Sequence, residues 1–271
     1  MAKVIAIDLG GTNLRVSLVN NNKIITYIKN KTPKNRKELI DLMFKNIELL
    51  MSKDIDGIGV ASAGPLKDGI IKNPPNLPLK NYNLKAALER RFKKRVVVCN
   101  DAHSVALAEA HLGVRKKNFI VLTLGTGVGG GIIINGKLYK GQGFGGEMGH
   151  MVLDNGKDFE SLVGWKSIKE LTKKAFGKEL LISDLMNIKS KKSKDILNKL
   201  TVYIGQGIGS LINIFDPEVV VLAGGVRDAG SSFLDMVKKQ AKKYSILPRT
   251  IPIQWSKLNH PGTLGASLLI K

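Results

Sequence analysis

The chain has 271 residues, of which 43% are hydrophobic, and its formal net charge at neutral pH is +21. This length and composition predict a globular protein of one large or two modest domains. Apolar runs stay below the roughly 18 residues of a membrane span, and the N-terminal segment lacks the pattern of a signal peptide. The single cysteine, Cys99, excludes an internal disulfide and a cysteine-built zinc site. We therefore expect a cytoplasmic protein without a membrane partner, in which Cys99 is an inert core residue.

Basic residues gather in clusters along the chain. The clusters lie at residues 29–37, 90–95, 115–117, 189–194 and 238–243. Such clusters can form a surface for nucleic acid or another polyanion. Here they are mostly lysines with few aromatic residues between them, so we favour solvated helix ends and loops over a specific nucleic-acid site.

Taken in chain order, strand patterns alternate with helix patterns, which predicts the α/β class. The first half shows strands at residues 3–9, 14–19, 24–28, 55–60 and 96–98, with helices at 36–52, 83–92 and 102–112. The second half shows strands at 119–124, 132–134, 219–222 and 251–255, with helices from residue 160 and at 194–215, 231–244 and 261–270. A strand, a glycine-rich turn and another strand occur twice, near 4–19 and 119–134, which suggests two related halves.

The two glycine-rich turns are candidate anion sites. The turn at residues 125–131 matches the dinucleotide fingerprint by letter, but a strand and an Asn135-Gly136 hairpin follow it where the fingerprint needs a helix. The lysine of a Walker P-loop is missing from both turns. Turns of this glycine density expose backbone N–H groups that can face a phosphate, although tight hairpins alone remain the alternative.

Asn100 and Asp101 stand between a run of three valines and a helix pattern. Ligands bind at the carboxyl ends of strands in open α/β sheets. Asn and Asp are also ordinary helix N-caps, and on this segment alone the cap is the favoured interpretation.

Two further features of the sequence need an explanation. Glu147 and His150 have the spacing of a metal pair, but the glycines around them oppose a helix, and the pair suits the hydroxyl groups of a small polar ligand. The long helix at 194–215 carries Gly205, Gly207 and Gly209, each of which costs up to about 1 kcal/mol relative to alanine. Close helix packing is the favoured reason, and a ligand against the backbone is the alternative.

Together these segments resemble the ROK family of sugar kinases, in the actin, hexokinase and heat-shock-70 ATPase superfamily. The matching pieces are residues 8–13, 76–77, 100–101, 123–131, 146–150, 216–218, 224–225 and 264–266. They follow family order over almost the whole chain, so the joint match is specific although each piece alone is weak.

The resemblance implies a role for each matching position. The residues implied to hold ATP are Gly10, Gly11, Thr12, Asn13, Thr126, Gly127, Gly224 and Gly225. Those implied to bind the sugar are Gly64, Asn76, Asn100, Asp101, Glu147, His150 and Glu160. Asp8 would lie beside Mg²⁺ and the phosphates, and Asp101 would be the general base that accepts the proton of the attacking hydroxyl. ATP and Mg²⁺ are thus the implied cofactors.

The chain departs from the family pattern in two ways. The family usually has a zinc loop after the histidine, which provides a His and three Cys ligands and ends in a further sugar-binding Glu. Residues 151–159 contain no cysteine and look shortened, so we expect no zinc and place that Glu at Glu160, across a gap. Many family members are repressors with an N-terminal helix-turn-helix, which we do not expect here.

The resemblance also implies the architecture. It is a two-domain actin-like ATPase fold, similar to ribonuclease H, with mixed sheets and a cleft between domains. We expect a small α/β domain at 1–113, with the helix at 261–271 packing back on it, and a large α/β domain at 114–260. A homodimer is expected because the family commonly dimerises.

Three functional hypotheses follow. The first is an ATP-dependent kinase of the 6-hydroxyl of a hexose: glucose above all, or else mannose, fructose, N-acetylmannosamine or N-acetylglucosamine. The second is a polyphosphate glucokinase, because the family's polyphosphate enzymes also lack the cysteine loop and a protein of charge +21 attracts polyanions. The third, a non-catalytic nucleic-acid binder, leaves the carboxylates of Asp8, Asp101 and Glu147 unexplained.

Overall fold

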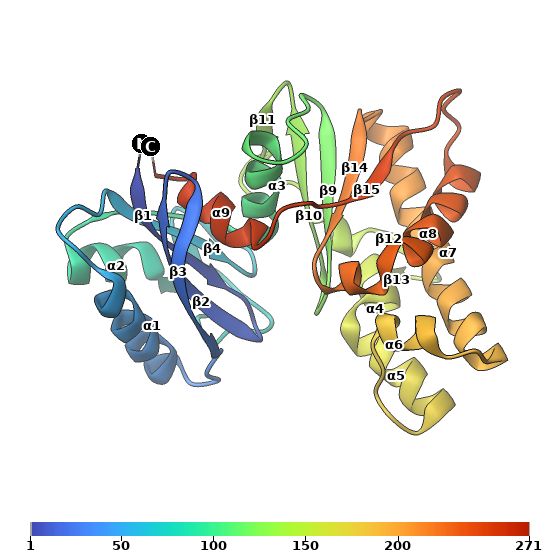
Figure 1. Cartoon of the computed structure of the whole chain (residues 1–271), viewed down its shortest axis with the longest axis horizontal. Helices are drawn as coiled ribbons and strands as arrows, with labels where there is room; N and C mark the ends of the chain where they lie inside the picture. Colours follow the sequence, from blue (N-terminus) through green and yellow to red (C-terminus); the bar gives the residue numbers. More distant parts are fainter. Residues whose placement is uncertain (1, 271) are drawn as a thin grey trace. The chain divides into compact units, whose positions relative to one another are not determined.

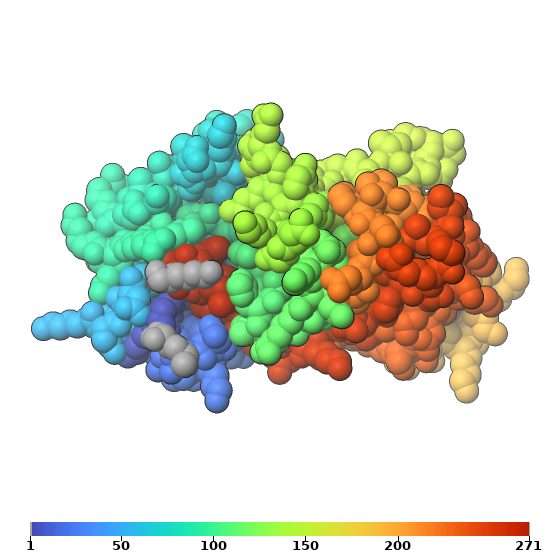
Figure 2. Space-filling view, turned by 90° about the horizontal axis from the view of Figure 1, so that it is seen from above, coloured from blue at the N-terminus to red at the C-terminus, as the bar shows by residue number. Residues whose placement is uncertain are grey.

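The computed structural model describes residues 2–270, which form two compact units. The first unit comprises the residues up to Arg115, the segment Leu138–Gly145 and the residues from Leu258 onward. The second comprises Lys116–Lys137 and Gly146–Lys257. In the space-filling view, red atoms of the C-terminal segment lie among the blue and green atoms of the first unit (Figure 2). Both units are therefore assembled from segments distant in the sequence.

The first unit is built on a five-stranded sheet with the order β3-β2-β1-β4-β8. Its strands are β1 (Lys3–Leu9), β2 (Asn13–Asn20), β3 (Lys23–Lys31), β4 (Gly57–Ser62) and β8 (Arg95–Asn100). β1 pairs antiparallel with β2 and parallel with β4, and β4 pairs parallel with β8. Helices α1 (Arg36–Leu50) and α2 (Leu84–Phe92) cover one face, whereas α3 (Asp101–His111) and α9 (Pro261–Ser267) lie on the other (Figure 1).

The second unit repeats this pairing pattern in the strand order β10-β9-β14-β15. Its strands are β9 (Phe119–Leu124), β10 (Val128–Ile134), β14 (Val219–Ala223) and β15 (Ile253–Trp255). A short strand of the same sheet, β11 (Lys137–Tyr139), follows β10 and continues into the segment Leu138–Gly145 of the first unit. β9 pairs antiparallel with β10 and parallel with β14, and β14 pairs parallel with β15. The expectation of two related halves is thus confirmed, because each unit combines a glycine-turn hairpin with parallel strands.

Helices and short loops complete the second unit. The longer helices are α5 (Trp165–Phe176), α7 (Lys191–Phe215) and α8 (Gly230–Tyr244), and the shorter ones are α4 (Phe159–Val163) and α6 (Ile182–Asn187). Single 3-10 turns are formed by η1 (Met148–His150) and η2 (Gly225–Ala229). Figure 1 shows α7 and α8 side by side. Three fully buried phenylalanines, Phe119, Phe159 and Phe233, anchor the core of this unit.

The structure corrects several predicted elements. The helix expected from residue 160 is two helices, α4 and α5, because Gly164 has an extended conformation between them. The short helix α6 was not anticipated, and α7 begins earlier than expected, at Lys191. Two small sheets were not anticipated: β5 (Leu66–Lys67), β6 (Ile70–Ile71) and β7 (Tyr82–Asn83) form one, and β12 (Val152–Asp154) and β13 (Lys157–Asp158) the other. Strands of two or three residues are too short to show the alternation of apolar and polar residues that predicts a strand.

Two further observations concern Cys99 and the hydropathy of the helices. Cys99 is buried in β8, and burial raises the pKa of its thiol to about 11, as expected for an inert core residue. Among the described residues, no helix is both long enough and apolar enough to cross a bilayer.

The glycines of α7 let α8 and α4 approach its backbone closely. A Cβ added at Gly205 would lie 2.4 Å from Gln240 Cβ, and one at Gly209 would lie 2.5 Å from Tyr244 Cβ. At Gly207 the obstacle would be the ring of Phe159, 2.7 Å away. Helix packing, the explanation favoured from the sequence, therefore accounts for all three glycines.

We predict that Gly205→Ala destabilises the protein although alanine favours a helix. The gain in helix propensity is up to about 1 kcal/mol. Overpacking against α8 costs about 1–3 kcal/mol, because the added Cβ would also lie 2.8 Å from the backbone carbonyl carbon of Gln240. Chemical denaturation should show a lower free energy of unfolding. The control is Asn198→Ala on the exposed face of α7, which should stabilise by a few tenths of a kcal/mol, roughly. A Gly205→Ala protein as stable as this control would contradict the packing explanation.

Candidate active site

The predicted site residues fall on both units, and each unit is described by itself. The first unit holds Asp8, Gly10, Gly11, Thr12, Asn13, Gly64, Asn76, Asn100 and Asp101. The second holds Thr126, Gly127, Glu147, His150, Glu160, Gly224 and Gly225.

In the first unit, Asp8 lies near the end of β1, directly opposite Arg15 on β2. The guanidinium Nη1 of Arg15 lies 3.0 Å from Asp8 Oδ2, and the Arg15 group packs 5.7 Å from the centre of the Tyr27 ring. Burial is the largest influence and raises the pKa of the Asp8 carboxyl above its usual value, although the charge and hydrogen bond of Arg15 lower it in part. Gly262 in α9 closes the other side, because a Cβ there would stand 3.2 Å from Asp8 Oδ2. Asp8 is therefore a carboxylate held in a fixed orientation.

The turn after Asp8 is anchored from several directions. The amide of Gly10 donates to the carbonyl of Asn13 at 3.0 Å, and the Thr32 hydroxyl donates to the carbonyl of Gly10 at 2.7 Å. A Cβ at Gly11 would lie 2.5 Å from Asn76 Cβ, so only glycine lets the Asn76 loop approach. The structure thus brings Asn76 against the first glycine turn, where the Thr12 side chain is exposed.

Lys34, between β3 and α1, contacts this turn and was not predicted from the sequence. Its ammonium Nζ donates to the carbonyl of Gly11 at 3.1 Å, which places a positive charge at the predicted phosphate turn. Its cluster at residues 29–37 was assigned to solvated surface, and lysine spacing alone could not separate this lysine from its neighbours.

Asn100 and Asp101 have different positions at the start of α3. Asn100 is the N-cap: its Oδ1 accepts from the amides of Ala102 at 2.9 Å and His103 at 3.2 Å. Its Nδ2 donates to the carbonyl of Gly64 at 3.4 Å. Asp101 is the first helical residue, and its Oδ1 accepts from the amide of Ala102 at 2.9 Å. The cap interpretation therefore holds for Asn100.

In the second unit, Glu160 lies against the second glycine turn. Its Oε2 accepts from the amide of Val128 at 2.8 Å, and a Cβ at Gly127 would stand 2.2 Å from the same oxygen. The amide of Trp165 donates to the carbonyls of Gly125 and Thr126 at 3.1 and 3.2 Å. Glu160, predicted across an alignment gap, is thus a structural partner of the turn as well as a candidate sugar ligand.

Glu147 is the residue before the short η1 turn and His150 is the last residue of that turn, and both are exposed. Their charges affect one another. Partial desolvation raises the pKa of the Glu147 carboxyl, His150 lowers it and Glu160 raises it. The pKa of His150 is raised above its usual value mainly by its hydrogen bond to Asp158 Oδ2, at 3.0 Å, and the charges of Glu160 and Glu147 add to this effect. The structure therefore brings Glu147, His150 and Glu160 into one cluster, together with Asp158, which the sequence analysis did not name.

A pocket of about 240 Å³ in the second unit adjoins the second glycine turn. Gly125 and Thr126 line it, together with the start of η2, where Gly225 is found. The rest of the wall is mainly apolar and comes from α4, α5, α6 and α7: Val163, Trp165, Ile168, Leu181, Ile182 and Ile204. Gly224 shapes the pocket indirectly, because with a φ of +93° it passes so close to β9 that a Cβ would lie 2.3 Å from the carbonyl of Leu124. The arrangement offers apolar walls beside a turn rich in backbone N–H groups.

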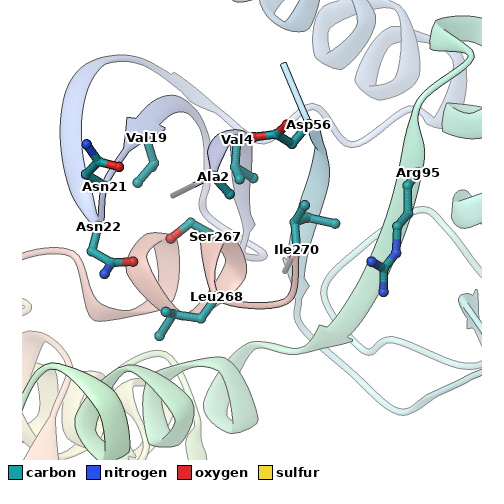
Figure 3. Close-up of a pocket in the computed structure, with 10 residues that line it drawn as sticks. All are labelled: Ala2, Val4, Val19, Asn21, Asn22, Asp56, Arg95, Ser267, Leu268 and Ile270. Atoms are coloured by element: carbon teal, nitrogen blue, oxygen red, sulfur yellow. The ribbon is translucent and has the colours of Figure 1, made fainter. Parts of the chain in front are cut away.

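A second pocket, of about 600 Å³ on the first unit, is distinct from these groups (Figure 3). Its lining includes Val4 at the start of β1, Arg95 at the start of β8 and Ile270 after α9. It thus lies at the amino ends of the parallel strands, whereas ligands bind at carboxyl ends in such sheets. We therefore leave it out of the candidate active site.

Comparison with known proteins identifies the family. Residues 4–271 match the sequence profile of the ROK family. The chain belongs to the ROK family. It is similar to the glucokinase of Thermotoga maritima, with 28% identity over 99% of this chain and 97% of the relative. The glucokinase of Halalkalibacterium halodurans is 27% identical over 98% of this chain and 94% of the relative.

The solved structures agree with the family and with the fold. A ROK family glucokinase from Streptomyces griseus, solved in complex with glucose and AMPPNP, superposes with a TM-score of 0.89. It is 25% identical, and the match covers 99% of both chains. The family and the two-domain actin-like α/β fold predicted from the motifs are therefore confirmed.

We predict that Asn100→Ala and Asp101→Asn affect stability differently. Asn100→Ala removes the acceptor of two amides and should lower the free energy of unfolding by about 1 kcal/mol. Asp101→Asn keeps an oxygen for the amide of Ala102 and should leave stability nearly unchanged. Urea denaturation measures both. If Asp101→Asn proved the more destabilising, capping would have to be reassigned to Asp101.

Proposed function

We propose that this sugar kinase of the ROK family transfers the γ-phosphoryl group of ATP to the 6-hydroxyl of a hexose, glucose first, with Asp101 as general base. The observation that carries the proposal is the division of roles at the end of β8. Asn100 caps α3, so the Asp101 carboxylate is not the helix cap. It stands at the carboxyl end of a strand, where a ligand is expected. The names of the relatives support glucose, and the AMPPNP complex of a related glucokinase supports ATP.

The reaction requires the removal of one proton and the neutralisation of much negative charge. As the sugar 6-oxygen bonds to the γ-phosphorus, its proton passes to Asp101, and the bond to the bridging oxygen of ATP breaks to leave ADP. On the first unit, Asn100, Asn76 and the Gly64 loop would bind sugar hydroxyls. On the second unit, Glu147, His150 and Glu160 would bind further hydroxyls. Each set of groups would orient the sugar hydroxyls that it binds.

The residues present fit Mg²⁺ as the implied metal. Mg²⁺ is held in kinases by one or two carboxylates together with substrate phosphates. Asp8 supplies such a carboxylate next to the first glycine turn. Within residues 2–270 no three His, Cys, Asp or Glu side chains form a group that could hold a metal, so the phosphates would supply most of the ligands. When bound, the ion would neutralise charge on the phosphates, and Gly10, Gly11, Thr12 and Asn13 would add hydrogen bonds.

The apolar pocket beside Thr126 favours ATP over polyphosphate as the donor. Polyphosphate has neither a base nor a ribose, so a pocket walled by Trp165, Ile168 and Leu181 would serve no purpose for it. An adenosine would bury apolar surface there and place its phosphates toward the turn at Gly125 and Thr126. The alternative donor is supported only by the net charge of +21.

We expect Asp101→Asn to lower kcat for hexose phosphorylation by about 10²–10⁴, because Asn cannot accept the proton. The sugar dissociation constant should change little, since the side chain keeps its size. The measurement is the formation of sugar 6-phosphate from ATP and Mg²⁺ with glucose, mannose, fructose, N-acetylglucosamine and N-acetylmannosamine. Undiminished turnover in this variant would refute the assignment of Asp101 as the base. If the unmodified protein formed no product from any of these sugars, with ATP or with polyphosphate, the kinase proposal would be refuted.

A second prediction separates the donors. A Cβ at Gly225 meets no atom within 4 Å, so Gly225→Val should leave the fold intact and fill part of the pocket. The KM for ATP should rise at least about ten-fold through lost contacts, while the KM for glucose stays constant. If polyphosphate were the donor, its KM would be insensitive to this change and ATP would be a poor substrate of the unmodified protein as well.

A further inference from the structure

The segment between His150 and Glu160 is a compact β-hairpin. β12 pairs antiparallel with β13, and the amide of Phe159 donates to the carbonyl of Met151 at 2.8 Å. Asn155 and Gly156 form the turn with φ values of +43° and +77°. This closure brings His150, two residues before β12, next to Asp158, the last residue of β13.

Asp158 uses both carboxylate oxygens. Its Oδ1 accepts from the amide of Ser161 at 2.8 Å and so caps α4, the helix that carries Glu160. Its Oδ2 lies 3.0 Å from Nδ1 of His150. One carboxylate therefore connects the imidazole of His150 to the helix that orients Glu160.

The helix α4 and the hairpin are each fixed by a further hydrogen bond. Glu160 is tied to the second glycine turn through the amide of Val128. At the opposite end of the hairpin, the hydroxyl of Tyr203 on α7 donates to Asp154 Oδ2 at 2.8 Å. With the hairpin and α4 fixed in this way, Asp158 has little freedom to move away from His150.

We propose that Asp158 is a positioning residue for the sugar site: it keeps the proton of neutral His150 on Nδ1 and thereby presents the Nε2 lone pair to a sugar hydroxyl. The carboxylate is an acceptor only, so the ring nitrogen facing it must be the donor. The other nitrogen then accepts, as in sites where a carboxylate sets the tautomer of a histidine ligand. The proposal rests on the proposed function, which places His150 at the sugar.

The pH dependence follows from the charges that face His150. These are Asp158 in β13, Glu160 in α4 and Glu147 before η1, and all three raise the pKa of the imidazole. Below that pKa both ring nitrogens carry protons, and Nε2 no longer accepts. The sugar KM should therefore increase as pH falls through the pKa of His150. In a variant whose neutral imidazole carries its proton on Nε2, that nitrogen accepts at no pH, so this pH dependence of the sugar KM should be lost.

The test is Asp158→Asn. The Asn side chain keeps an oxygen for the amide of Ser161, and Asn is as good an N-cap as Asp, so the fold should be retained. Its amide nitrogen would face His150 Nδ1 as a donor and move the imidazole proton to Nε2. We expect ¹⁵N-detected NMR to show the Nδ1–H tautomer in the unmodified protein and the Nε2–H tautomer in the variant. The sugar KM should rise roughly ten-fold, which is the size of effect seen when a ligand histidine loses the carboxylate that orients it. The KM for ATP should stay constant.

The matched control is Asp154→Asn, which changes the other end of the same hairpin and weakens only the contact to Tyr203. It should keep the Nδ1–H tautomer and the sugar KM of the unmodified protein. Equal effects of the two variants would mean that hairpin rigidity matters and not the tautomer, which would overturn the proposal. Unchanged tautomer and KM in Asp158→Asn would overturn it as well. If the unmodified protein phosphorylates no sugar, the proposed function fails, while the NMR measurement still decides what Asp158 does to His150.

Discussion

Parallel pairing of strands is the constraint on which the site in each unit depends. In the first unit, Leu9 on β1 pairs with Ser62 on β4, and Ser62 pairs with Asn100 on β8. The three strands therefore end side by side, and the residues that follow them emerge at one edge of the sheet. In the second unit, Thr123 on β9 pairs with Ala223 on β14 in the same manner. Residues far apart in the sequence thus meet because the backbone hydrogen bonds of the sheet leave no other register.

Glycine has a second task at these edges, which is to let a side chain reach the turn. Gly11 admits Asn76, and Gly127 admits Glu160, at separations that no Cβ would tolerate. The glycine density that looked like an anion-binding signal is therefore also a packing requirement. Anion binding and close packing are compatible, because a turn of glycines can contact a neighbouring side chain on one face and expose its backbone amides on the other.

Several carboxylates in this protein accept hydrogen bonds from backbone amides. Glu160 holds the amide of Val128, and Asp158 holds that of Ser161. At the start of α3, the amide side chain of Asn100 is the N-cap, and the carboxylate of Asp101 accepts from the amide of Ala102.

The sequence by itself determined the α/β class, the family and the identity of most candidate residues. These rest on local signals: apolar strands, glycine turns and the order of motifs along the chain. It missed Lys34, Arg15, Trp165 and Asp158, because their roles come from partners that lie far away or across a hairpin too short to show a period. Only the tertiary structure decided that Asn100 is the cap, that the glycines of α7 pack against α8 and α4, and that Asp158 faces His150. The physical reason is that hydrogen bonds and close packing depend on distance in space, which a linear pattern records only where the chain is locally regular.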